Sequence, residues 1–302
     1  MVKKKQKIFL LLLISFLMLP LSTHANIHPA QDIMYLYAGE LPYLSFFEPY
    51  TVGILALNEL EYGRNIDKVK RFIEWHFENL NYPDRYGING TIYDFNIKRG
   101  WALPTYTYDS IDGYSGLFLH LLVKYYDLTQ DRKIIESNWD KVVDVAYTIP
   151  FLQEGDGLTV ALITTNEKYL TDNCESYGGI SAYIRLREIM GLERSPSFER
   201  AGQRIKEGIF KRLYNPKKKI FSFLIEDEEV NDTTWERYYP DAYGQFFVIY
   251  YEVAEDKPKI MKNIWKNFTR RYAEKENEFP IEQRIMYQLT RNKIEQKYPH
   301  IL

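Results

Sequence analysis

The chain has 302 residues, of which 39 are Lys or Arg and 41 are Asp or Glu. This slightly acidic balance argues against nucleic acid as a partner, because binding phosphates requires a basic surface. The single cysteine, Cys174, rules out an internal disulfide, and with only five histidines besides we expect no metal site and no cofactor.

Residues 1–25 have the pattern of a signal peptide. A lysine-rich start precedes an apolar run over 8–19, and Thr23 and Ala25 are small residues at the −3 and −1 positions of a cleavage site. The run is shorter than the roughly 20 residues that span a bilayer. We therefore expect a secreted or extracytoplasmic protein in which 26–302 form a single domain without stable membrane insertion. The alternative is an uncleaved membrane anchor.

A short pattern of acid-x-Tyr, followed by a glycine and an apolar run, occurs four times. It appears at Glu48–Tyr50, Asp112–Tyr114, Glu175–Tyr177 and Asp241–Tyr243, and the successive acids are 64, 63 and 66 residues apart. Regular spacing of this kind is typical of repeated structural units.

The remainder of each unit also repeats. An almost uncharged run follows the pattern, as in 115–126 and 244–253, and predicts a helix buried on all sides. An amphipathic helix is then expected at 67–80, 132–149, 198–213 and 258–272. Short β stretches are expected at 91–93, 158–162 and 220–223, and residues 280–298 predict one further helix. The sequence thus predicts an all-α ring of helical hairpins, with the β excursions and the repeated acids at one end.

The repeated acids have two interpretations. Asp109 and Asp112, like Asp172 and Glu175, are three residues apart at helix starts, which fits helix capping. Alternatively, a ring of units gathers several carboxylates at one mouth, where like charges raise one another's pKa. A protonated carboxylic acid beside an ionised one is the pair that glycoside cleavage requires. A calcium site is a further use of such acids, but a 12-residue loop of alternating ligands is not present.

The candidate catalytic residues are carboxylates near the predicted starts of inner helices: Asp112, Asp241, Glu175, Glu48, Asp109 and Asp94. The candidate substrate-binding residues are aromatic and share that position: Trp101, Tyr114, Tyr177, Trp235, Tyr238 and Tyr243. Such rings stack on sugar faces, and the chain has 26 tyrosines, although most of these fit half-buried seams between helices.

The sequence resembles the six-hairpin glycosidase-like superfamily in five stretches: 80–84, 90–94, Tyr108–Tyr114, Tyr169–Glu175 and Tyr239–Tyr243. The resemblance covers most of residues 26–302. It implies an (α/α) toroid, or barrel, possibly an incomplete six-hairpin ring, and carbohydrate as the substrate.

A looser similarity is to the inverting family 8 glycoside hydrolases. It implies that Glu48 is the general acid and Asp241 the general base, and that Asp109 and Asp112 hold the sugar at the cleavage point. The residues that follow Glu48 and precede Asp241 depart from that family's pattern.

The first hypothesis is therefore an exported glycoside hydrolase that cleaves a poly- or oligosaccharide with paired carboxylates. The alternative is a non-catalytic carbohydrate-binding protein on the same toroid. A lyase or epimerase is a third possibility and would need a basic side chain in the cleft, for which His120 is the candidate. The sequence does not predict an oligomeric state.

Overall fold

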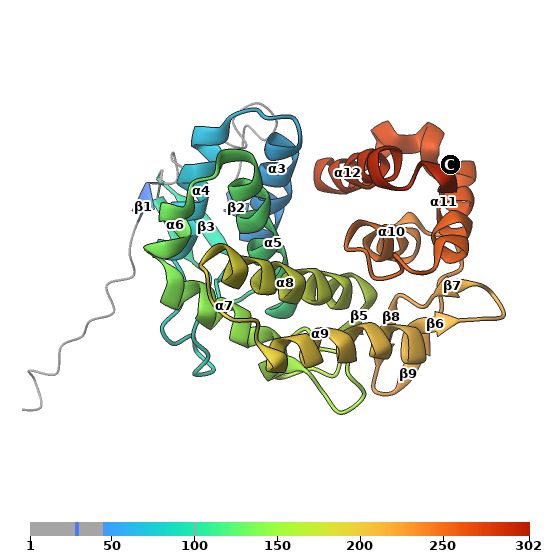
Figure 1. Cartoon of the computed structure of the whole chain (residues 1–302), viewed down its shortest axis with the longest axis horizontal. Helices are drawn as coiled ribbons and strands as arrows, with labels where there is room; N and C mark the ends of the chain where they lie inside the picture. Colours follow the sequence, from blue (N-terminus) through green and yellow to red (C-terminus); the bar gives the residue numbers. More distant parts are fainter. Residues whose placement is uncertain (1–27, 30–44, 100) are drawn as a thin grey trace, which may run out of the picture.

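The computed structural model describes residues 28–29, 45–99 and 101–302, so the predicted signal segment lies outside them. Within these ranges five helices form an inner ring: α3 (Pro49–Glu61), α5 (Asp112–Thr129), α8 (Leu170–Ile189), α10 (Tyr243–Tyr250) and α12 (Ile281–Lys297). Each contacts the next in chain order, and α12 packs against α3, which closes the ring (Figure 1).

The amphipathic helices lie outside this ring and bury one face each. They are α4 (Ile66–Glu78), α6 (Arg132–Glu136), α7 (Trp139–Leu152), α9 (Pro196–Gly208) and α11 (Pro258–Tyr272). The prediction of a single helix at 132–149 is wrong, because the helix is interrupted between α6 and α7. At the interruption the Asn138 side chain donates to the Ile134 carbonyl. The helix predicted at 280–298 is α12, the fifth inner helix.

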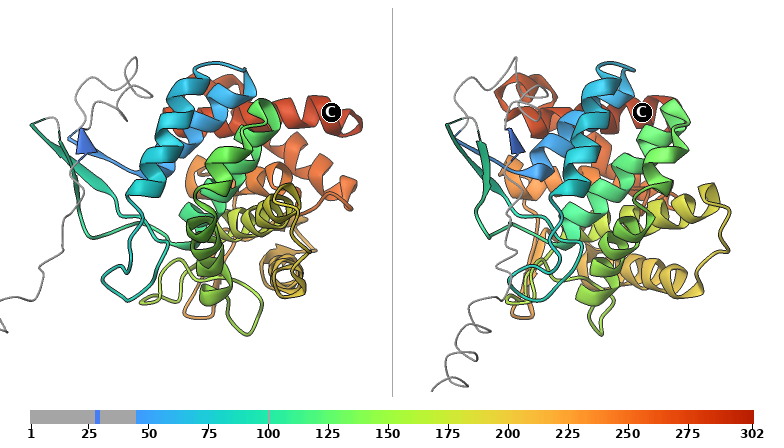
Figure 2. Two further views of the ribbon diagram at one scale, coloured as in Figure 1. Left: turned by 60° about the vertical axis from the view of Figure 1, so that its left-hand side comes forward. Right: turned by 90° about the vertical axis from the view of Figure 1, so that its left-hand side faces the viewer.

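The strands form three small antiparallel sheets. One has the order β1 (His28–Pro29), β4 (Trp101–Pro104), β3 (Phe95–Lys98), β2 (Phe46–Phe47), and the β3–β4 hairpin stands to one side of the helices (Figure 2). The others pair β5 (Lys168–Tyr169) with β8 (Leu224–Glu226) and β9 (Glu229–Asn231), and β6 (Tyr214–Asn215) with β7 (Ile220–Phe221).

Two of the three predicted β stretches are wrong. Residues 91–93 are a buried loop, in which the Thr91 carbonyl accepts from the Asn81 amide and the side chains of Ile92 and Tyr93 are both buried instead of alternating. Residues 158–162 contain only an isolated bridge, between Thr159 and Gln153. The third prediction, 220–223, is confirmed by β7.

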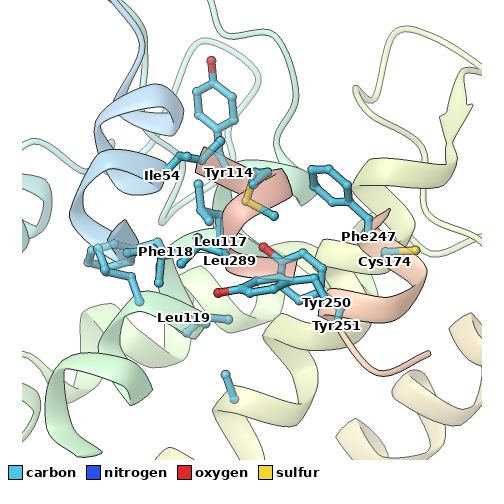
Figure 3. Close-up of a cluster of buried hydrophobic side chains, with 14 of the residues drawn as sticks. Ile54, Tyr114, Leu117, Phe118, Leu119, Cys174, Phe247, Tyr250, Tyr251 and Leu289 are labelled. Atoms are coloured by element: carbon cyan, nitrogen blue, oxygen red, sulfur yellow. The ribbon is translucent and has the colours of Figure 1, made fainter. Parts of the chain in front are cut away.

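The interior of the ring is filled with apolar and aromatic side chains from all five inner helices. Figure 3 shows part of this core, including Ile54, Phe118, Cys174, Phe247 and Leu289, one from each inner helix. Burial on this scale is the main source of stability for such a fold. Among the described residues, no helix combines the length and the hydropathy of a membrane span.

Candidate active site

A cleft of about 180 Å³ opens at the end of the ring where the inner helices begin. We call it the acidic cleft, and its lining residues are Glu48, Tyr50, Thr51, Asp109, Ser110, Tyr114, Thr171, Asp172, Tyr239, Tyr243, Glu282 and Gln283. Each of the five inner helices supplies some of them, from its first turns or from the residues just before it. These lining residues include four carboxylates and no Lys, Arg or His.

The acid pairs on α5 and α8 are arranged in the same way. Asp109 and Asp172 line the cleft, whereas Asp112 and Glu175, each three residues later, lie about one turn deeper and are 0% and 1% exposed. The cleft therefore has two layers of carboxylates, one that lines it and one buried beneath the lining.

Asp112 is held by two hydrogen bonds in the buried layer. The Thr159 hydroxyl donates to its Oδ2 over 2.5 Å and the Gly113 amide to its Oδ1 over 2.9 Å. Burial nevertheless raises the pKa of Asp112 to about 7, and the charge of Asp109 adds to the effect. Burial likewise raises the pKa of Asp172 well above its usual range, with a further contribution from Asp112. A proton is thus retained within this pair near neutral pH.

Glu175 is the second carboxyl of the buried layer. The Tyr50 hydroxyl donates a hydrogen bond to the Glu175 carboxyl. The Oε1 atom of Glu175 has no hydrogen-bond partner among the described residues. Burial, followed by the charge of Asp172, raises the pKa of Glu175 well above its usual range. A Cβ on Gly113 would lie 2.9 Å from Glu175 Oε2, so the glycine makes room for the carboxyl.

Asp94 lies behind the cleft wall. The Tyr114 hydroxyl donates to Asp94 Oδ1 over 2.8 Å, and the Tyr114 ring stacks on Tyr50 with 5.5 Å between centroids. The pKa of Asp94 is raised to about 7, mainly by burial and to a smaller extent by the charges of Glu48 and Asp109. Asp94 therefore does not line the cleft itself but holds the lining residue Tyr114 through a hydrogen bond.

Asp241 does not line the acidic cleft. Its side chain is fully buried, accepts from Arg237 over 3.0 Å at Oδ1 and from the Thr234 hydroxyl over 3.0 Å at Oδ2. Its neighbour Tyr239 lines the cleft instead. The catalytic role predicted for Asp241 stays a prediction, while its contacts are those of a residue that holds the turn before α10.

The capping interpretation of the acid pairs is wrong. The N-cap residues of α5 and α8 are Ile111 and Tyr169, and neither helix has a side-chain cap hydrogen bond. The carboxylates are instead turned toward the cleft or toward the core beneath it. Asp112 and Asp172 nevertheless lie in the first turns of their helices, where the helix dipole favours a negative charge.

The aromatic candidates divide into two groups. Tyr114 and Tyr243 line the cleft. The other four lie outside its lining: Trp101 is exposed on β4, Tyr177 contacts Lys206, Trp235 packs against Arg271, and Tyr238 stacks on Phe279 at 3.6 Å between centroids. Their substrate-binding roles stay predictions.

Sequence reasoning missed Asp172, Tyr239, Glu282 and Gln283 as cleft residues. The signal for Asp172 was present, because it stands to Glu175 as Asp109 stands to Asp112. Glu282 had no comparable signal, since α12 lacks the acid-x-Tyr pattern. Burial, followed by the charge of Glu48, places the pKa of Glu282 above its usual value.

The other chemical possibilities find little support in the structure. His120 lies in the ring interior, 3.3 Å from the Tyr250 hydroxyl, and burial lowers its pKa well below the usual value. It does not line the acidic cleft. Across residues 28–29, 45–99 and 101–302, there is no group of three His, Cys, Asp or Glu side chains placed to hold a metal ion.

No protein-family profile and no curated protein matches the sequence, but solved structures are similar in fold. A rhamnosidase from Klebsiella oxytoca with rhamnose bound has a TM-score of 0.53 and 12% identity, over 85% of this chain and 49% of that one. A family 78 rhamnosidase of Bacillus sp. GL1 has a TM-score of 0.53 and 13% identity, over 84% of this chain and 27% of that one.

A third similar structure is an α-1,6-mannanase of family 76 from Salegentibacter sp. HEL1_6. It is an inactive variant, with two consecutive aspartates changed to asparagine, in complex with α-1,6-mannotriose. Its TM-score is 0.52 at 12% identity, over 80% of this chain and 69% of that one. The chain thus spans about half of the first rhamnosidase and about two thirds of the mannanase. These likenesses show that the chain has an α/α-toroid fold.

Proposed function

We propose that this protein is an exported glycoside hydrolase whose acidic cleft cleaves a neutral glycan without a cofactor. The observation that carries the proposal is the two-layered set of carboxylates at the mouth of an α/α toroid. Four of them line the cleft; burial raises the pKa of Asp112 beneath them to about 7 and raises the pKa of the lining Asp172 well above its usual range. An acid that is protonated and an acid that is ionised, in one cleft, are the requirement for glycoside cleavage.

Asp172 is the proposed proton donor. It lines the cleft, and burial together with the charge of Asp112 raises its pKa well above the usual range, which favours the protonated form that a proton donor needs. Glu48 is the proposed base or nucleophile. It lies at the start of α3, its Oε2 accepts from the Thr51 hydroxyl over 3.0 Å, and α5 separates it from α8. In the order of the ring, α5 therefore lies between the helix that begins after Glu48 and the helix that carries Asp172.

The lining favours a neutral sugar. Four carboxylates without a lining cation would repel uronic acids or sulfated sugars. Four tyrosines line the cleft, and the Tyr239 ring, which is 60% exposed, offers an apolar face on which a sugar ring can stack. The similar structures include enzymes named for rhamnose and α-1,6-mannan, so these sugars are the first substrates to try.

The test is reducing-sugar release from α-1,6-mannan, rhamnose-containing oligosaccharides, xylan and starch. Asp172→Asn and Glu48→Gln are compared with Asp127→Asn, an exposed carboxylate near the other end of α5. Loss of a general acid or base lowers the rate by about 10²–10⁴-fold. We expect such a loss in both cleft variants, with unchanged circular dichroism, and full activity in the control.

An activated substrate separates the two roles. An aryl glycoside with an acidic leaving group needs little protonation, so Asp172→Asn should cleave it far better than it cleaves the natural glycoside, whereas Glu48→Gln should not. Unchanged turnover in both variants would remove these residues from the mechanism. Glycan binding without release from any substrate would favour the carbohydrate-binding protein.

A further inference from the structure

A second and larger cavity, of about 450 Å³, lies outside the ring. The loop at 87–89, the second half of α7 and the start of α9 enclose it, and its lining residues are Gly87, Ile88, Asn89, Asp144, Tyr147, Thr148, Pro150, Phe151, Ser197 and Phe198. It shares no lining residue with the acidic cleft. A volume of this size is in the range of sites that bind small molecules.

Two exposed aromatic rings line this cavity, and a third lies near its residue Asp144. Tyr147 and Phe151 are 56% and 64% exposed and stand four residues apart on α7, so both point from the same face of the helix. Tyr82 is 45% exposed and lies close enough to Asp144 for that carboxylate to raise its pKa, after the larger effect of burial. Large rings left in solvent around a cavity mark a surface suited to binding.

A carboxylate stands among these rings without a partner. Asp144 lines the cavity, and within the described residues its side chain has no hydrogen bond and no ion pair. Burial raises the pKa of Asp144, and the charge of Asp140 adds to this effect. The side chain of Asn89 is exposed at the same cavity. The site therefore offers an acceptor and an amide beside apolar ring faces.

We propose that this cavity is an accessory carbohydrate-binding site that holds a neutral glycan segment while the acidic cleft acts on the chain. Sugar hydroxyls donate to a carboxylate and bond an amide, and the apolar face of a pyranose stacks on an aromatic ring. An apolar protein surface placed here would bury the Asp144 carboxylate unpaired, at a high cost in free energy. The choice of ligand class rests on the proposed function.

The position of the cavity fits a glycan that extends from the acidic cleft. Ile88 and Asn89 line the second cavity, and the residues that follow them, Gly90 and Thr91, line a small internal void that Ser110 and Tyr114 of the cleft also line. The loop at 87–91 thus connects the lining of the second cavity to residues that line the acidic cleft. A polysaccharide long enough to cross this loop contacts both sites.

The test is native electrophoresis in gels that contain α-1,6-mannan or another polysaccharide of the panel. All proteins carry Asp172→Asn and Glu48→Gln, so that the glycan is not consumed. Adding Tyr147→Ala and Phe151→Ala should weaken the apparent affinity about tenfold, from the loss of two stacking rings. The matched control is Tyr62→Ala, which removes an exposed ring next to the C-terminal end of α3.

Equal retardation with and without the two α7 rings, or retardation by none of the polysaccharides, would overturn the accessory site. So would a dimer in sedimentation velocity that dissociates on Phe151→Ala, because the rings would then be a contact between two copies. Failure of the proposed function looks different. In that case no glycan is hydrolysed, while retardation that depends on Tyr147 persists.

Discussion

Gly116 on α5 and Gly179 on α8 are in direct backbone contact, since a Cβ on Gly179 would lie 2.5 Å from the Cα of Gly116. A Cβ on Gly116 would lie 2.3 Å from the carbonyl oxygen of Glu175. The two inner helices can approach this closely because neither glycine has a side chain. The approach brings Asp112 of α5 beside Asp172 and Glu175 of α8, and so creates the buried layer of the cleft.

We therefore expect Gly116→Ala to destabilise the fold. The new methyl group has no space against the α8 backbone, and overpacking of this kind costs about 1–3 kcal/mol or more. Urea unfolding gives the change in free energy. Gly155→Ala is the control, because a Cβ there meets nothing within 4 Å. Equal stability of Gly116→Ala and the wild type would show that the two helices are not held at this distance in solution.

The buried acids predict that stability falls as the pH rises toward neutrality. The pKa of Asp94 is about 7 in the folded protein and about 3.9 in an unfolded chain. Between these values the folded state holds a proton that the unfolded state releases, so the free energy of unfolding decreases with pH. Asp112 acts in the same direction, with a pKa of about 7.

Asp94→Asn should flatten this pH dependence, because the amide stays neutral and its oxygen can still accept from Tyr114. The effect expected between pH 4 and pH 8 is on the order of a few kcal/mol. Urea unfolding at a series of pH values measures it, with Asp127→Asn as the control. A slope that Asp94→Asn leaves unchanged would mean that this carboxyl titrates normally in the fold.

Asp241→Asn should act mainly on stability. Arg237 and Thr234 both donate to the Asp241 carboxylate, and an amide would set its own donor against one of them. We expect a loss of about 1–3 kcal/mol, measured by urea unfolding, and a kcat close to that of the wild type. A kcat that drops by a factor of a hundred or more in a stably folded variant would instead restore Asp241 as the general base.

Tyr239→Ala should weaken substrate binding. The ring is 60% exposed at the acidic cleft, where it can stack on a sugar. Loss of one stacking ring predicts a rise in KM of about threefold to tenfold, with kcat largely kept, because the ring holds ground state and transition state alike. Steady-state kinetics beside Tyr62→Ala provide the measurement. A fall in kcat alone, at constant KM, would contradict the stacking role.

The sequence was sufficient for the ring of helices and for the end at which the acids gather. Apolar runs without charge predict buried helices, and amphipathic runs predict outer ones, because the spacing of apolar residues indicates which faces of a helix are buried. The strand predictions failed where the backbone found other hydrogen-bond partners than the composition suggests. Residues 91–93 have a strand-like composition, yet Asn81 binds their backbone and the hairpin forms at β3 and β4.

What the sequence by itself determined is that Asp109 and Asp112, like Asp172 and Glu175, stand three residues apart at the start of an inner helix. Only the tertiary structure decided which acid of each pair reaches the cleft and which is buried beneath it. The tertiary structure also places Glu282 of α12 in the cleft lining, and it pairs Asp241 with Arg237 in a salt bridge. The physical reason is that spacing fixes the face of a helix, whereas exposure along that face depends on how neighbouring helices are placed against it.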